Sequence, residues 1–345
     1  MRNREAGASV KKYNAAFFPF ECNQNKYIDL MKKMYAACGV EIKPFCGLKN
    51  LKNIDFIILN WYESAGRKDM LKRSVMLFLF FVKKKKIVWT MHNKHPHDTA
   101  FPFLSRLFMR VIEMFSYKII IHSRESLKFI KYIKKAVYIP HPCYINAYGP
   151  RAAPEALDGK RLKLLFVGQI RRYKNIEILI SAFNSLNLEN AVLTVCGMAA
   201  PEYALETGLL INGNKNIQTR FEFIKDEEMP GLIANHHILV FPYDLRSSLN
   251  SGSIILSFSY KRTVIAPLNG TLADMNNKDL FFSYEYKNER DHEEKLKNKI
   301  LEIYTRYKDN YNELLCLGEC CHNEVLRNNG MDVLVKEASR IFHSS

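Results

Sequence analysis

The sequence predicts an α/β protein with two consecutive doubly wound, Rossmann-like domains that face a cleft. Short apolar runs alternate with amphipathic segments along the chain, as in repeated strand–helix units. Runs such as Ile54 to Trp61 are mostly apolar, which is typical of strands buried on both faces of a parallel sheet. The alternation starts again after a segment rich in Pro, Ala and Gly, from Tyr148 to Lys160, which indicates a second domain.

The first half of the chain is expected to hold alternating strands and helices. Strands are predicted at residues 10–18, 40–45, 54–61, 86–93, 116–123 and 136–142, and helices at 26–38, 69–82, 101–115 and 124–135. Gly39 ends the first helix. Four lysines, Lys83 to Lys86, follow the second, where positive charge favours a helix C-terminus.

The second half repeats the alternation. Strands are predicted at residues 161–170, 190–197, 216–224, 238–242, 264–266 and 280–286, and helices at 173–183, from about 201, at 226–235, from 252, at 289–307 and from 311 to the end. We therefore expect a first domain over residues 1–148, a linker over 149–160 and a second domain over 161–320. Residues 321–345 are expected to form a C-terminal helix that packs back on the first domain.

Composition limits the class of protein. The chain has 345 residues and a net charge of +16, which favours an anionic partner such as a nucleotide-linked substrate or an anionic membrane. It contains no apolar stretch long enough to span a membrane, and its first residues do not resemble a secretory signal, so we expect a cytoplasmic protein. The eight cysteines indicate reduced thiols, and the CLGECCH string that ends at His322 lacks the second ligand pair of a zinc finger.

The stretch from Ile238 to Pro267 contains the first candidate phosphate site. A strand leads into a serine-rich loop and then into a helix that opens at Gly252. Ser251, Gly252 and Ser253 would place hydroxyl groups and free backbone N–H groups at the helix start, where the helix dipole favours an anion. The alternative is an ordinary capped helix.

A second candidate follows the strand that ends at Gly168. Arg171, Arg172 and Lys174 come just before a helix start near Asn175. Guanidinium and ammonium groups beside a helix start are suited to a diphosphate. The alternative is a solvated basic turn. In a doubly wound sheet both candidates would open at the carboxyl edge of the strands.

Titratable side chains are densest in HNKHPHD, which follows the strand at 86–93. His92, His95, His97 and Asp98 would lie where the carboxyl ends of parallel strands place ligands. A histidine here could act as a general base, since its unperturbed pKa is close to neutral. Structural roles and metal binding are the alternatives, although the spacing matches no known ligand pattern.

The blocks GQIRRYKNIEILISAF, FIKDEEMPGLIANHHILVFPY and SGSIILSFSYKRTVIAP resemble the nucleotide-sugar domain of group 1 glycosyltransferases, which have the GT-B fold. NWYES, WTMHNKHPHD, IIIHSRES and YIPHPCYINAYG are similar to the acceptor domain of bacterial polysaccharide glycosyltransferases of that group. The resemblance covers nearly the whole chain. It implies transfer of a sugar from a nucleotide-sugar donor to a glycan or lipid-linked acceptor in surface polysaccharide biosynthesis.

The resemblance also implies roles for particular residues. Its diphosphate-binding basic pair falls on Arg172 and Lys174, with Arg171 as a substitute, and its distal phosphate site falls on 251–253. The strand end at Phe223, Ile224 and Lys225 falls where such enzymes hold the nucleobase by backbone contacts. No cofactor and no metal ion are expected, because the nucleotide sugar is a co-substrate and basic groups can neutralise the leaving diphosphate.

One departure from the family concerns the glutamate pair of its retaining members. Alignment on VIAP places those two positions at Ser248 and Leu256. We therefore favour an inverting mechanism, with His97, Asp98 or His95 as the base and with Glu21 and Glu63 as further candidates.

Three alternatives to this function remain from the sequence alone. They are a non-hydrolysing sugar-nucleotide epimerase of the same fold, a degenerate glycosyltransferase, and a non-enzymatic anion-binding protein. Nucleic acid is not expected as a partner, because no recognised nucleic-acid-binding motif occurs. The lysine run and the Phe-rich helix at 101–115 are expected to place the protein peripherally on the inner face of the plasma membrane.

Overall fold

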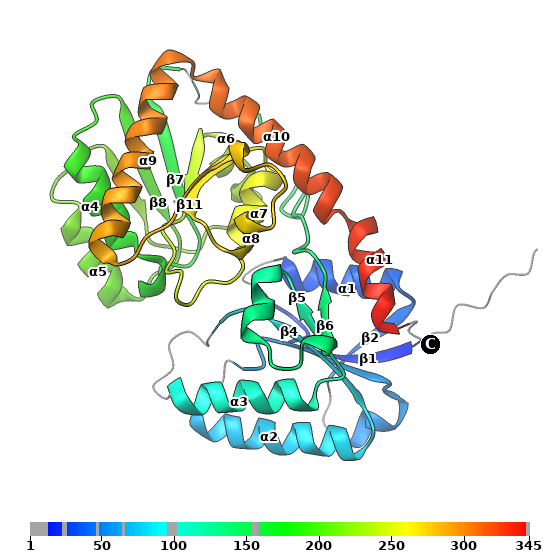
Figure 1. The fold of residues 1–345 in the computed structure, drawn as a ribbon. Helices are drawn as coiled ribbons and strands as arrows, with labels where there is room; N and C mark the ends of the chain where they lie inside the picture. The colour runs from blue at the N-terminus through cyan, green and yellow to red at the C-terminus, as the bar shows by residue number, and fades with distance from the viewer. Residues whose placement is uncertain are drawn as a thin grey trace, which may run out of the picture.

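The computed structural model describes residues 13–22, 26–45, 48–63, 66–94, 102–153, 157 and 159–342. Its first sheet has six parallel strands and forms the N-terminal lobe, at the bottom of Figure 1. The strand order β2-β1-β3-β4-β5-β6 reverses between β1 and β3. The strands are β1 (Tyr13–Phe18), β2 (Val40–Pro44), β3 (Phe56–Asn60), β4 (Lys86–Met91), β5 (Lys118–Ile121) and β6 (Ala136–Tyr138).

The second sheet forms the C-terminal lobe and is also parallel throughout. Its order is β12-β11-β10-β7-β8-β9, with a reversal between β10 and β7. The strands are β7 (Leu162–Val167), β8 (Ala191–Cys196), β9 (Ile217–Arg220), β10 (Ile238–Val240), β11 (Thr263–Pro267) and β12 (Phe282–Tyr284). Two doubly wound parallel sheets confirm the predicted fold class.

Helices cover both faces of each sheet. In the N-terminal lobe they are α1 (Tyr27–Ala37), α2 (Arg67–Val82) and α3 (Pro102–Phe115). In the C-terminal lobe they are α4 (Ile176–Leu186), α5 (Pro201–Leu210), α6 (Met229–Ala234), α7 (Gly252–Ser259), α8 (Gly270–Ala273) and α9 (Glu289–Asp309). Figure 1 shows α2 and α3 side by side on the outer face of the N-terminal lobe. No helix in the described part of the chain is both long and apolar enough to cross a membrane.

The last two helices connect the lobes. Helix α10 (Asn312–Asn329) packs on α7, and α11 (Met331–Phe342) crosses to the N-terminal lobe, where it lies against α1 (Figure 1). Leu334, Ala338, Ile341 and Phe342 are buried in one cluster with residues of β1 and α1. The end of the described chain is therefore part of the core of the first lobe.

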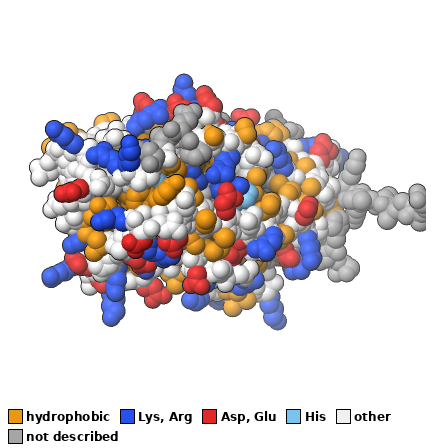
Figure 2. Space-filling model, turned by 90° about the horizontal axis from the view of Figure 1, so that it is seen from above, with side chains coloured by type: hydrophobic (Ala, Val, Ile, Leu, Met, Phe, Trp, Pro, Cys, Tyr) orange, Lys and Arg blue, Asp and Glu red, His pale blue; other side chains and the backbone are white. Residues whose placement is uncertain are grey.

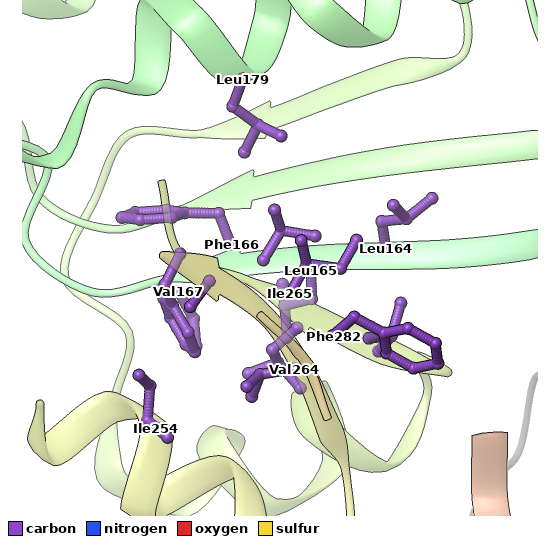
Figure 3. Close-up of a cluster of buried hydrophobic side chains, with 14 of the residues drawn as sticks. Leu164, Leu165, Phe166, Val167, Leu179, Ile254, Val264, Ile265 and Phe282 are labelled. Carbon is purple, nitrogen blue, oxygen red and sulfur yellow. The ribbon is translucent and has the colours of Figure 1, made fainter. Parts of the chain in front are cut away.

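The core of the C-terminal lobe is formed by its central strands and the helices that pack on them. Figure 3 shows side chains of β7 and β11 in contact with Ile254 of α7 on one side, while Leu179 of α4 lies on the other. These residues are fully buried. At about 25 cal/mol per Å² of buried apolar surface, such packing is the main source of stability for a lobe of this kind. It holds the carboxyl ends of β7 and β10 in fixed positions.

Several predicted elements differ from the structure. The strand expected at 136–142 ends at Tyr138, and two helices, α10 and α11, take the place of the single helix expected from 311 to the end. The helix expected at 124–135 is wrong: two short 3₁₀ turns, Arg124–Phe129 and Ile133–Lys135, flank an extended Ile130. The reason is that the backbone N–H of Tyr132 donates to the buried carboxylate of Glu113 instead of to a helical carbonyl. The strand expected at 216–224 ends at Arg220, and residues beyond it form a loop.

Candidate active site

The candidate active site lies at the point where the strand order of the second sheet reverses. Strands β7 and β10 are neighbours there, and ligands bind at such reversal points in open α/β sheets. Gly168 follows β7, and the loop that follows β10 runs to Ser251, the N-cap of α7. Both segments singled out from the sequence as phosphate sites therefore reach the same edge of one sheet.

Lys174 is the central cation of this edge. Its side chain is 8% exposed, and burial, with a smaller contribution from Arg171, lowers its pKa to about 8. A Cβ placed on Gly168 would lie 3.1 Å from the Lys174 ammonium and 3.9 Å from the Ser253 hydroxyl. The ammonium has aromatic rings on two sides, with Phe166 and Tyr243 each at 5.7 Å. Gly168, Lys174 and Ser253 form a site that is called the phosphate pocket below. No described carboxylate forms an ion pair with Lys174, so this site has an uncompensated positive charge.

The start of α7 supplies hydrogen-bond donors to the same pocket. Ser251 caps the helix, because its hydroxyl accepts from the backbone N–H of Ile254 at 3.2 Å. The Tyr243 hydroxyl interacts with the hydroxyls of Ser251 and Ser253. The first N–H groups of α7, at Gly252 and Ser253, have no acceptor within the helix. This pocket therefore combines a buried ammonium, a hydroxyl and helix-start N–H groups around Gly168.

The other two basic residues of the predicted diphosphate site lie differently. Arg172 is exposed and forms an ion pair with Glu206 of α5. Its Nη2 donates to both carboxylate oxygens, at 3.0 and 2.8 Å. It also lies over the ring of Tyr203. The Nε of Arg171 donates to the side-chain oxygen of Gln169 at 3.1 Å. The structure thus brings Lys174, Gly252 and Ser253 together but directs Arg172 toward α5.

The residues predicted beside the nucleobase follow β9 in a loop. Phe223 is 48% exposed, Ile224 is buried, and Lys225 precedes the 3₁₀ turn Asp226–Glu228. Asp226 forms an ion pair with Lys26, just before α1, so this loop contacts the N-terminal lobe. The loop after β9 therefore presents one exposed aromatic ring, that of Phe223.

Opposite the pocket, the N-terminal lobe contributes a buried group of imidazoles and aromatic rings. His92, His122 and His141 follow β4, β5 and β6, and each is less than 9% exposed. The ring of Tyr27 lies within 5.5 Å of all three rings. Burial lowers the pKa of His122 to about 4 and of His141 to about 3, and it lowers the pKa of His92 well below its usual value. All three imidazoles are neutral at pH 7.

Hydrogen bonds fix the tautomers of two of these rings. Nδ1 of His122 donates to the carbonyl of Ile139 at 2.8 Å, so its Nε2 accepts from the Tyr27 hydroxyl at 2.7 Å. Nδ1 of His141 donates to the carbonyl of Pro142 at 3.1 Å, which leaves Nε2 as an acceptor.

His141 borders the start of α7 across the interface of the lobes. A Cβ on Gly252 would lie 3.2 Å from Nε2 of His141 and 2.9 Å from the Tyr144 hydroxyl. A side chain at this position would displace both groups, which explains the glycine. Sequence reasoning did not select His122 or His141 as site residues. The signal was present, because both follow predicted strands of the same parallel sheet as His92.

The loop after β10 also contacts the N-terminal lobe directly. Leu249 is fully buried in the hydrophobic cluster of that lobe. The ammonium of Lys94 donates to the carbonyl of Leu245 at 2.9 Å, and the side-chain amide of Asn250 donates to the carbonyl of His92 at 3.4 Å. The residues that follow β4 therefore meet the loop that leads into the phosphate pocket.

Of the predicted bases, the structure describes Glu21 and Glu63. His95, His97 and Asp98 lie outside the described part of the chain. Glu21 is exposed after β1. Glu63 is fully buried after β3; one carboxylate oxygen accepts from the indole N–H of Trp89 at 3.1 Å, and the other has no partner. Burial raises the pKa of Glu63 to about 7.

The CLGECCH string is part of α10 and has structural contacts. Nδ1 of His322 donates to the carbonyl of Ser259 at 2.9 Å, and Cys321 is buried beside Leu280. Cys316 and Cys320 are exposed. No group of three His, Cys, Asp or Glu side chains in the described residues is arranged to hold a metal ion.

Comparison with known proteins gives three kinds of similarity. Residues 151–247, which include β7, Lys174 and the start of the loop after β10, match the family described as glycosyl transferases group 1. In this part the chain is therefore similar to group 1 glycosyltransferases. It is also 22% identical over 278 residues to a GDP-mannose:glycolipid 4-beta-D-mannosyltransferase of Xanthomonas campestris pv. campestris, and the match covers 76% of each chain.

Solved structures show that the chain has the GT-B fold. HepE of Anabaena, solved with UDP and glucose, matches it with a TM-score of 0.71 at 11% identity, covering 97% of this chain and all of HepE. Sucrose-phosphate synthase of Thermosynechococcus elongatus matches with a TM-score of 0.72 at 13% identity, covering 96% and 98% of the two chains. The predicted family resemblance and fold are confirmed.

Proposed function

We propose that the pocket around Gly168 binds the diphosphate of a nucleotide-sugar donor. The observation that carries this proposal is Lys174, a buried ammonium without an ion pair among the described carboxylates. Burying a charge without a partner is costly, so the site favours an anion that restores the balance. Ser253 and the first N–H groups of α7 would bind further phosphate oxygens. HepE, which has the same fold, was solved with UDP.

The acceptor in this proposal is a glycan or a glycolipid in surface polysaccharide biosynthesis. The matched relative from Xanthomonas campestris is named for transfer to a glycolipid. The acceptor would enter from the N-terminal lobe, whose histidine group and Tyr144 face the start of α7.

We also propose that the transfer inverts the anomeric carbon and needs no metal ion or other cofactor. The acceptor oxygen would attack C1 of the sugar while the bond from C1 to the diphosphate breaks, and a base would take the hydroxyl proton. His95, His97 and Asp98 are our candidates, since this segment follows Lys94, which contacts the loop after β10. Lys174 and the start of α7 would stabilise the negative charge on the leaving diphosphate. Ser248 and Leu256 stand where retaining relatives carry glutamates.

A further part of the proposal concerns the membrane. Helices α2 and α3 expose the large apolar side chains of Leu71, Val75, Phe78, Phe81, Val82, Phe103, Leu107 and Met114. Lysines 83–86 follow α2 directly. An apolar helix face beside basic residues binds the interface of an anionic bilayer, with about 1 kcal/mol for each basic residue near the surface. We propose that this face holds the protein peripherally on the cytoplasmic side.

A transfer assay tests the proposed function. The purified protein would be incubated with radiolabelled UDP-, GDP-, CDP- and ADP-sugars, with and without a bacterial glycolipid extract. We expect label in the lipid phase and release of free nucleoside diphosphate only when both substrates are present. Conversion of the donor sugar without any acceptor would instead support an epimerase and contradict the proposal. The anomeric configuration of the product, and turnover in EDTA, would test inversion and metal independence.

A further inference from the structure

The N-terminal lobe contains a groove that the donor site does not use. It has a volume of about 390 Å³ and lies between α3, the end of β4 and the 3₁₀ turn Arg124–Phe129. Its apolar lining comes from Trp89, Met91, Phe103, Leu107, Met109 and Ile130. Its charged lining comes from Lys94, Arg106, Arg110, Lys128 and Glu113. The groove is therefore apolar with a basic rim.

The charges of the rim are not balanced. Arg110 forms an ion pair with Glu113 at 2.6 Å, and Lys94 forms one with Glu125 at 2.9 Å. Arg106 and Lys128 form no ion pair with any carboxylate in the described part of the chain. Two basic side chains at one groove, with no counter-charge among the described residues, favour an anionic ligand.

The position of the groove connects two other features. One of its lining residues, Lys94, reaches the carbonyl of Leu245 in the loop that leads to the phosphate pocket. Two others, Phe103 and Leu107, belong to the exposed apolar face of α3 and are 76% and 53% exposed. A ligand that follows the groove would run from the apolar outer face toward the donor site. Such a ligand has an apolar chain at one end and a negatively charged group before its reacting end.

We propose that this groove binds the phosphate or diphosphate of a lipid-linked acceptor, with the lipid chain over α3 and the sugar directed toward the loop after β10. The proposal rests on the proposed function and specifies its acceptor as a lipid phosphate. A neutral glycolipid would leave Arg106 and Lys128 without a partner. A water-soluble anion would not use the apolar lining.

Binding of isoprenoid probes tests the proposal on the full-length protein. Calorimetric titration would compare farnesyl diphosphate, inorganic diphosphate and farnesol below the concentration at which the lipid probes aggregate. We expect farnesyl diphosphate to bind at least 10-fold more tightly than either fragment. We expect the R106E/K128E variant to weaken this binding at least 30-fold. The R290E/K295E variant carries the same charge change on exposed positions of α9, in the other lobe, and should stay within 3-fold of the wild type.

Two further controls make the result decisive. Thermal shifts with nucleoside diphosphates should be the same in the wild type and in R106E/K128E, because the donor pocket lies in the other lobe. If R106E/K128E does not fold, R106Q/K128Q replaces it and should weaken farnesyl diphosphate binding at least 10-fold. Equal binding of farnesyl diphosphate by the wild type and the groove variants would overturn the groove proposal. Absence of any nucleoside diphosphate shift in the wild type would count against the donor site and leave the probe titration readable.

Discussion

Each lobe has a pair of outer helices that pack together, and the two pairs have different surfaces. In the C-terminal lobe α4 and α9 pack together, and Leu301 is the one large apolar side chain exposed on the pair. In the N-terminal lobe α2 and α3 pack together in the same way but expose several large apolar side chains. A doubly wound fold therefore does not require exposed phenylalanines on its outer helices. We propose that the outer face of the N-terminal lobe has an interaction role.

The lobes also differ in the charges that they bury at their interface. The C-terminal lobe buries a cation, Lys174, while the N-terminal lobe buries the neutral imidazoles of His92, His122 and His141. On the face of the molecule seen in Figure 2, basic side chains are interspersed with acidic ones. Lys174, by contrast, is buried beside Gly168. This contrast leads us to assign the donor phosphates to the C-terminal lobe and the acceptor to the N-terminal lobe.

The largest expected effect comes from removing the buried cation. Lys174→Ala should weaken binding of the nucleoside diphosphate by about 3 kcal/mol, or roughly 100-fold, because a charge-assisted contact is lost in a buried site. Arg172→Ala is the matched control and should change the affinity less than about 3-fold, since Arg172 is exposed and paired with Glu206. Calorimetric titration measures both variants. An equal loss in the two would show that the donor turns Arg172 into the pocket.

The next largest effect concerns the apolar outer face. Leu71→Ser together with Phe78→Ser should reduce binding to anionic vesicles by roughly 10- to 100-fold, at about 1 kcal/mol or more for each lost apolar side chain. Leu205→Ser with Leu209→Ser removes similarly exposed apolar side chains from α5 of the other lobe and should leave vesicle binding unchanged. Vesicle sedimentation would decide between them. Equal loss in both double variants would remove the distinction between the lobes.

A smaller effect is expected from the imidazoles at acidic pH. The folded pKa of His141 lies below that of the unfolded chain, so the unfolded state binds more protons as the pH falls below about 6.5. Stability should therefore be retained above that pH and lost below it, by about 1–2 kcal/mol for this residue between pH 7 and pH 5. His141→Gln should lose less stability over this interval than the wild type in urea unfolding. The same pH dependence in both proteins would show that folding does not lower the pKa of His141.

The smallest effect is the pH dependence of donor binding. A bound diphosphate favours the charged form of Lys174, whose pKa in the empty protein is about 8. Affinity should therefore be highest below pH 8 and fall by about 10-fold between pH 7 and pH 9 as the free ammonium loses its proton. Titration of the wild type and of Lys174→Met at both pH values measures this difference. An equally steep decrease in the variant would assign the proton to another group.

Much of the fold followed from local patterns, whereas the site depended on contacts between the lobes. The apolar runs and the glycines at their ends predicted the parallel strands and the position of Lys174. The sequence could not show that Arg172 pairs with Glu206, which lies 34 residues away and approaches it only after α4 and α5 have packed. It also could not show that His141 meets Gly252, because that contact depends on how the two lobes are oriented. The 124–135 segment has helical spacing, yet the buried Glu113 holds Tyr132 in a different conformation.

The most direct test of the account is a thermal-shift screen of the wild type and Lys174→Met against UDP, GDP, CDP and ADP. A ligand that binds only the folded state at a hundredfold excess over its Kd adds about 2.7 kcal/mol of stability. We predict that one nucleoside diphosphate raises the melting temperature of the wild type and that Lys174→Met loses most of this increase. The account would be contradicted if no nucleoside diphosphate stabilised the wild type, or if the variant were stabilised as much as the wild type.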